Sequence, residues 1–167
     1  MSAEEKYLRQ ARAQRVSKIK WTLFWGGSVL LVVGMLWVGA KKEDPNNPLV
    51  ARAGVHYHAK LSVEVNGKEE EVPSGIGLVA GMEHPQQMHT HENDQVVHVE
   101  IPGKVYEDEI RLINFFKVWG KDLTATSLLG AVATGTQKVF MTVNGKDESR
   151  LGDYPIKDGD DIKVVLR

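Results

Sequence analysis

The sequence predicts an α+β protein that consists of one hydrophobic helix followed by a single small domain. Three observations indicate this organisation: an apolar stretch without charges, two copies of a hairpin pattern, and one segment with helical spacing of apolar residues. Strands accompanied by one packed helix are typical of α+β folds, whereas a doubly wound sheet needs strands and helices in alternation. We therefore expect one modest hydrophobic core behind an N-terminal helix.

The apolar stretch runs from Trp21 to Ala40 and contains no charged residue. Twenty residues are about the length that an α-helix needs to cross a hydrocarbon layer of roughly 30 Å. We expect a single-pass transmembrane helix over residues 21–40. The motif at residues 38–40 also resembles a signal-peptide cleavage site, but the stretch is longer than the roughly 7 to 15 apolar residues of a signal sequence. The pattern therefore favours a membrane anchor.

The charge distribution predicts how this helix is oriented. Residues 1–20 carry six basic and two acidic side chains, a net charge of +4, and the rest of the chain carries a net charge of −5. The positive-inside rule makes residues 1–20 a cytoplasmic basic tail and the domain extracytoplasmic, at the cell membrane. A membrane-protein partner would fit this location. Nucleic acid is not an expected partner, because the domain is acidic and has no basic patch.

Residues 41–50 are polar, include two prolines, and predict a short linker. The extracytoplasmic α+β domain is then expected over residues 51–167. The chain has no cysteine, so neither a disulfide nor a thiolate metal ligand is available. No Walker-type loop, dinucleotide-binding glycine motif or nucleophilic triad signature is present, which argues against nucleotide-binding and serine hydrolase classes.

Two segments of the domain share the sequence Val-Asn-Gly-Lys between runs that alternate apolar and polar residues, at residues 61–72 and 139–151. Asn-Gly between such runs is the strongest local signal for a β-hairpin, because a type I′ turn needs two residues that tolerate positive φ. We expect one hairpin near each end of the domain.

A central strand and one helix are expected between the hairpins. Residues 95–101 are rich in β-branched residues and predict a strand. Residues 107–119 have acidic residues in the first turn, helical spacing of apolar residues, and Gly120 just past the end, which predicts a helix. The stretch from Pro73 to His89 is expected to be an insertion outside the sheet.

The last segment, residues 154–166, has a turn at residues 157–160 that leads into a closing strand. This ending resembles that of ubiquitin-like domains. The preferred topology is accordingly β-grasp-like, with the first hairpin and the last strands flanking a crossing helix.

The histidines are the chemically informative residues, because all six lie between His56 and His98. Residues two apart on a strand point to the same face. Two ligand side chains separated by one residue, as in His56/His58, His89/His91 and His98/Glu100, would therefore lie side by side. Three such pairs could converge on one pocket and form a metal site there, since imidazole is the commonest metal ligand. The candidate ligands are His56, His58, His89, His91, His98 and Glu100.

The donor set suggests copper or zinc as the metal ion. Imidazoles with one carboxylate suit zinc, copper, iron or nickel, and the thioethers of Met82 and Met88 beside the cluster tilt the choice towards copper. Both methionines are more often packing residues, however. His84, which precedes a proline, is the least suitable ligand of the six histidines.

The pattern His-Thr-His-x6-His-x-Glu, at residues 89–100, follows a His-x-His pair and a Val-Asn-Gly hairpin and precedes Phe-Phe-x-x-Trp-Gly at residues 115–120. This combination resembles a set of small membrane-anchored or secreted prokaryotic proteins to which no activity is assigned, so the resemblance implies a location but no mechanism. The pair His89 and His91 also resembles the cupin His-x-His motif. The spacing to the next acid and the glycine frame differ from cupins, so their dioxygenase chemistry does not follow.

Three functions fit these observations. The first is a metal-binding module without turnover. The second is a metalloenzyme in which His89, His91 and His98 leave an open position and Glu100 acts as the base. The third is a metal-free interaction or pH-sensing domain, in which Phe115, Phe116 and Trp119 form a contact surface, although core packing of these three is the more common role.

Overall fold

The computed structural model describes residues 18, 20, 21, 23–35, 44–78, 85–92 and 94–167. The chain divides into two compact units, Met1–Glu43 and Asp44–Arg167, and each is described by itself.

In the first unit, the described residues between 18 and 35 are helical. Their large apolar side chains are exposed, among them Trp21, Phe24, Leu30 and Met35. Among the described residues, none of the helices combines the length and the apolar character needed to cross a bilayer. Residues 22 and 36–40 of the predicted span lie outside the described part of the chain, as does most of the predicted basic tail.

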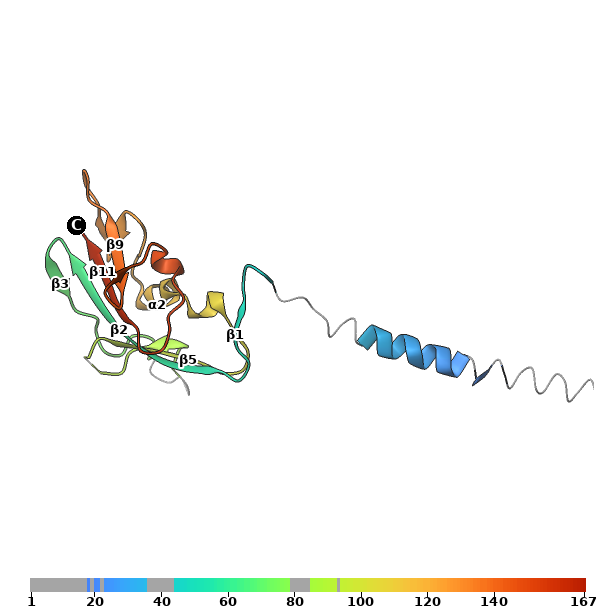
Figure 1. The fold of residues 1–167 in the computed structure, drawn as a ribbon. Coiled ribbons are helices and arrows are strands. Elements are labelled where there is room, and N and C mark those ends of the chain that lie inside the picture. The colour runs from blue at the N-terminus through green and yellow to red at the C-terminus, as the bar shows by residue number, and fades with distance from the viewer. Residues whose placement is uncertain (1–17, 19, 22, 36–43, 79–84, 93) are drawn as a thin grey trace, which may run out of the picture. The chain divides into compact units, whose positions relative to one another are not determined.

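The second unit is a mixed α+β domain built on one twisted sheet (Figure 1). The strands pair in the order β10-β9-β11-β2-β5-β4, and β3 pairs with β2. The pair β2 and β11 is parallel, and the other pairs are antiparallel. The strand bounds are β2 Val55–Val65, β3 Lys68–Glu70, β4 Met88–His89, β5 Val96–Ile101, β9 Val139–Val143, β10 Lys146–Asp147 and β11 Asp161–Leu166.

Both predicted hairpins are confirmed. The β2–β3 turn has Asn66 at φ 54° and Gly67 at φ 81°, and the β9–β10 turn has Asn144 at φ 53° and Gly145 at φ 75°. Positive φ at both turn positions is the geometry that Asn-Gly favours. The predicted central strand and closing strand are also present, as β5 and β11.

The predicted helix over residues 107–119 is interrupted. A 3₁₀ helix, η1 (Glu107–Ile110), is followed by α2 (Leu112–Trp119), and Arg111 between them is extended, with ψ 140°. The interruption arises because Arg111 forms a β-bridge with Pro155, and the flanking Leu112 and Ile156 amides donate to carbonyls across this bridge. Local helical spacing could not reveal this long-range pairing. The predicted end is correct, since Gly120 closes α2 in the left-handed conformation.

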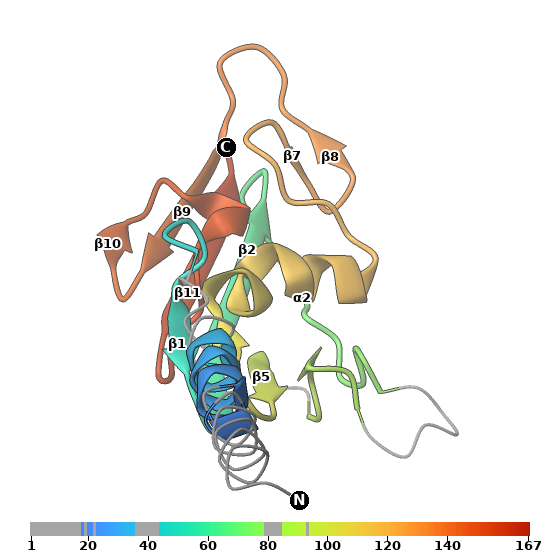
Figure 2. The same ribbon diagram turned by 90° about the vertical axis from the view of Figure 1, so that its right-hand side faces the viewer.

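The core lies between the sheet and α2, which crosses one face of the strands (Figure 2). Phe115 and Phe116 are fully buried there, and Trp119 packs against them. The interpretation of these aromatic residues as a contact surface is therefore wrong, and their role is packing.

Short elements complete the domain. They are β1 (Leu49–Ala51) paired with β6 (Val105–Tyr106), β7 (Ser127–Leu128) paired with β8 (Ala131–Val132), and the 3₁₀ helix η2 (Leu151–Asp153). The last two residues of the predicted linker thus belong to β1.

Candidate metal centre

Three adjacent strands bring five of the six predicted ligands onto one face of the sheet, and the sixth, His91, follows the end of β4. In the strand register, His58 of β2 lies opposite His98 of β5, and His98 lies opposite His89 of β4. His56 lies opposite Glu100 in the neighbouring row. Along β5 the alternate residues face the core, so His98 and Glu100 point away from it. The expected convergence of the histidine pairs is thereby confirmed.

The strand β4 corrects one expectation. The stretch from Pro73 to His89 is not wholly an insertion, because its last two residues pair with β5. A two-residue strand has too few positions to show an alternating pattern, so only its partner reveals it. The pairing is extended by the Glu100 amide, which donates to the Gln87 carbonyl at 2.8 Å.

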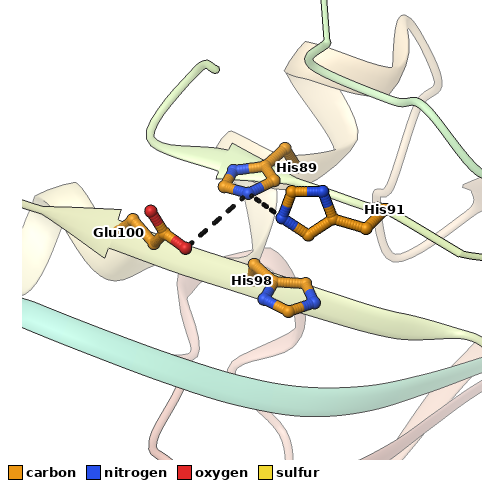
Figure 3. A group of neighbouring side chains, drawn as sticks. All are labelled: His89, His91, His98 and Glu100. Carbon is orange, nitrogen blue, oxygen red and sulfur yellow. Dashed lines mark hydrogen bonds and ion pairs between the residues drawn. The ribbon is translucent and has the colours of Figure 1, made fainter. Parts of the chain in front are cut away.

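The inner group consists of His89, His91, His98 and Glu100 (Figure 3). One ligand atom from each lies within 4.8 Å of the others, so these four side chains could hold a metal ion. Nε2 of His89 lies 3.0 Å from Nε2 of His91 and 3.9 Å from Oε1 of Glu100. The side chain of His89 is completely buried, whereas His91 is exposed. The group is therefore buried on the side of His89 and open to solvent on the side of His91.

The orientation of His89 is set by the main chain. Its Nδ1 lies 2.8 Å from the carbonyl oxygen of Gln86, which can only accept a hydrogen bond. The proton of the neutral imidazole is therefore on Nδ1, and Nε2 presents its lone pair to His91 and Glu100. Metal-ligating histidines in proteins are commonly held in this way, because the second ring nitrogen donates to a carbonyl or carboxylate.

A layer of backbone contacts supports this histidine. Thr90, which is buried, donates its hydroxyl to the Pro73 carbonyl and accepts the Ile76 amide. Gly77 has φ 75°, and a Cβ built on it would lie 2.6 Å from the Met88 carbonyl oxygen and 3.0 Å from Cβ of His89. Only glycine fits such a close approach without a shift of the backbone.

The outer group consists of His56, His58 and His98, whose ligand atoms also lie within 4.8 Å of one another. Nε2 of His56 lies 3.2 Å from Oε1 of Glu100. Nδ1 of His58 lies 3.8 Å from Oδ1 of Asp158, and the His58 amide donates to that same oxygen at 2.9 Å. Each of the two exposed histidines of the outer group, His56 and His58, thus has a carboxylate beside it.

His98 belongs to both groups, and its Nδ1 is buried without a hydrogen-bond partner in the described structure. A buried nitrogen with no partner is costly in a protein interior unless it meets water or a ligand. Burial lowers the pKa of His98, and the neighbouring His91 and His58 lower it further. Burial likewise lowers the pKa of His89. Both shifts favour the neutral form of the ring, which is the form that binds metal.

An open groove of about 750 Å³ borders the site at His56 and Glu100. Its other walls are mostly apolar. The residues that line it are Ala53, Gly54, Val55, Pro85, Gln87, Ile101 and Pro102.

All six predicted ligands are therefore found in one of the two groups or in both. Met88 lies in the core, on the face opposite the histidines, and does not offer its sulfur to them. Met82 and His84 lie outside the described residues. Sequence reasoning missed the roles of Asp158, Gln86, Thr90 and Gly77, because each acts through the backbone or through a long-range contact.

No match was found when the chain was compared with family models, with curated proteins and with solved structures. The resemblance to small membrane-anchored prokaryotic proteins thus stays a prediction, and the geometry of the site carries the functional argument.

Proposed function

We propose that this chain is a membrane-anchored, extracytoplasmic metal-binding protein whose inner group holds one copper or zinc ion. The observation that carries the proposal is the convergence of three imidazoles and one carboxylate from β4, β5 and the segment after β4, with the His89 tautomer already fixed by a carbonyl. Such fixed orientation lowers the cost of assembling the ligands around an ion.

The donor types support this choice of metals. Three nitrogen ligands and one oxygen ligand suit zinc or divalent copper better than the hard cations magnesium and calcium, which prefer oxygen. The thioether of Met88 is turned into the core, so it gives no support to a preference for monovalent copper. The retention of zinc and of copper by the purified chain would distinguish the two metals.

The number of ligands supports binding rather than turnover. A structural zinc site is closed by four protein ligands, whereas a catalytic one has three and keeps a position for water. The inner group supplies four. We therefore favour a protein that holds or transfers an ion.

The membrane location rests on the sequence. Residues 21–40 carry no charge, the preceding residues 1–20 are basic, and the described part of the helix exposes its large apolar side chains. A helix that is apolar all round is stable only when it is surrounded by apolar material. Extraction of cell membranes with alkaline carbonate tests this: the chain should stay in the pellet, and release into the supernatant would reject the anchor.

The domain is proposed to be β-grasp-like. Its hairpin β2–β3, the parallel pair β2 and β11, and the crossing helix α2 support this topology. In that arrangement β5 and β4 are additions to the edge of β2. They carry three of the six candidate ligands, His89, His98 and Glu100, and His91 follows β4.

Metal analysis of the full chain tests the binding proposal. The chain is purified in mild detergent, stripped with a chelator, exposed separately to zinc and to copper, and extensively exchanged into metal-free buffer. Retention of at least one equivalent would support the proposal and identify the preferred metal. Retention of neither metal would reject it and favour a pH-sensing or interaction domain.

A metalloenzyme is the second candidate, and the groove of about 750 Å³ beside Glu100 favours it. If Glu100 leaves the ion to act as a base, three histidines would remain as ligands and a substrate in the groove would meet an open position. The cobalt-substituted chain tests this alternative. A change in its visible spectrum on addition of azide would show an open position, and an unchanged spectrum would favour a closed binding site.

A further inference from the structure

We propose that the outer group is a second metal site, and that His98 lies between two ions and contributes one ring nitrogen to each. This inference rests on the proposed metal-binding function and extends it from one ion to two.

The strand register places His98 between two other histidines. His58, His98 and His89 occupy one row across β2, β5 and β4, so His98 has a histidine on each side. The ring centroids of His58 and His91 lie 4.7 Å and 4.6 Å from that of His98, and both rings meet it edge-on. His98 is therefore about equally close to the outer and the inner histidines.

The chemistry of imidazole allows one ring to bind two ions. A neutral ring has one nitrogen with a free lone pair and one that carries a proton. Binding of a second ion displaces that proton to solvent, and the resulting imidazolate binds one ion through each nitrogen, with no change of oxidation state. Nδ1 of His98 is buried and has no hydrogen-bond partner in the described structure, so no protein group competes for it.

Negative groups near both sites would compensate the charge of two ions. Two divalent ions so close together need negative groups nearby, and uncompensated charges in a partly buried site are costly. Glu100 lies 3.2 Å from His56, and Asp158 lies 3.8 Å from His58. With the imidazolate, these carboxylates would offset three of the four positive charges.

Exposure distinguishes the two sites. The side chains of His56 and His58 are 59% and 51% exposed, whereas that of His89 is fully buried. The outer site, with three protein ligands, should bind the second ion more weakly than the inner site with four, and should exchange it with solvent more readily.

Copper loading of the full chain in mild detergent tests the proposal. We expect two copper ions per chain after buffer exchange, and an integrated low-temperature electron paramagnetic resonance signal well below two spins, because a bridging imidazolate couples the two ions. The double variant His56→Ala/His58→Ala should retain one copper and show one full spin. His84→Ala is the matched control and should behave as the wild type.

The outcomes are separable. Fewer than two copper ions per wild-type chain would overturn the second site, and only retention of neither copper nor zinc would reject the proposed function as well. Two coppers with a full two-spin signal would overturn the shared role of His98. Because a loss of ions could reflect unfolding, the conservative variant His58→Gln is measured alongside. Its thermal melt should match that of the wild type, and a return to two coupled coppers in that variant would also overturn the assignment.

Discussion

Nδ1 of His89 lies 2.8 Å from the carbonyl oxygen of Gln86, and this contact turns Nε2 of the same ring towards His91 and Glu100. The relationship matters because the partner is a main-chain atom. The side chain at position 86 is exposed, so it could be substituted without loss of the contact. A change in the backbone path between Gln86 and β4 would move the carbonyl oxygen and break it. The site thus depends on the local chain path as much as on the ligands.

The first prediction concerns the ligands themselves. His89→Ala, His91→Ala and His98→Ala should each lower the affinity for the preferred metal by more than the roughly 10- to 100-fold that loss of an outer-sphere partner costs. Competition with a chromophoric chelator measures this. Gln86→Ala keeps the carbonyl and should leave the affinity unchanged, as should His84→Ala. Equal affinity in all five variants would contradict the site assignment.

The second prediction concerns Gly77, which packs against His89. Gly77→Ala should destabilise the domain by roughly 2 kcal/mol or more, because the new Cβ meets the Met88 carbonyl oxygen at 2.6 Å in a backbone conformation with φ 75°. It should also weaken metal binding. Gly75→Ala is the matched control: its φ is 78° but nothing lies within 4 Å of the new Cβ, so about 1 kcal/mol is expected. Urea unfolding followed by circular dichroism would compare the two, and similar losses would contradict the close-contact argument.

The third prediction concerns pH. Burial lowers the pKa of His89 and His98 in the folded protein, while in the unfolded chain both should titrate near 6.5. As the pH falls below about 6.5 the unfolded state gains protons first, so the metal-free domain should be fully stable above this pH and lose stability below it.

Thermal melts of the chelator-treated chain at pH 7.5 and 5.5 would measure this effect. We expect the wild type to melt several degrees lower at the acidic pH. The double variant His89→Gln/His98→Gln should show a smaller difference, and an equal difference would place the pH dependence elsewhere.

The fourth prediction concerns Asp160, a buried carboxylate beside the turn that contacts His58. It accepts hydrogen bonds from the Tyr154 hydroxyl, the Lys157 amide and the Asn144 side chain, at 2.8, 2.8 and 3.0 Å. Asp160→Ala should cost about 3 kcal/mol, because buried donors lose their partner. The exposed neighbour Asp161→Ala should change stability by less than about 0.5 kcal/mol. Denaturant unfolding of both variants checks this, and equal losses would contradict a structural role for the Asp160 carboxylate.

The local features of this protein could be predicted from its sequence. The two Asn-Gly turns, the central and closing strands, and the end of α2 at Gly120 follow from conformational preferences of single residues and their neighbours. The placement of His56 with His58, and of His98 with Glu100, on one face also follows locally, because strand residues alternate between the two sides. The candidate ligands could therefore be named before their arrangement was known.

Only the tertiary structure decided how these pairs meet. The alignment of His58, His98 and His89 depends on the register of three strands, and the contact between His58 and Asp158 joins residues 100 positions apart. The break at Arg111 and the two-residue strand β4 depend likewise on distant partners. Such pairings arise from the packing of the whole domain, and no stretch of local sequence contains the information that selects them.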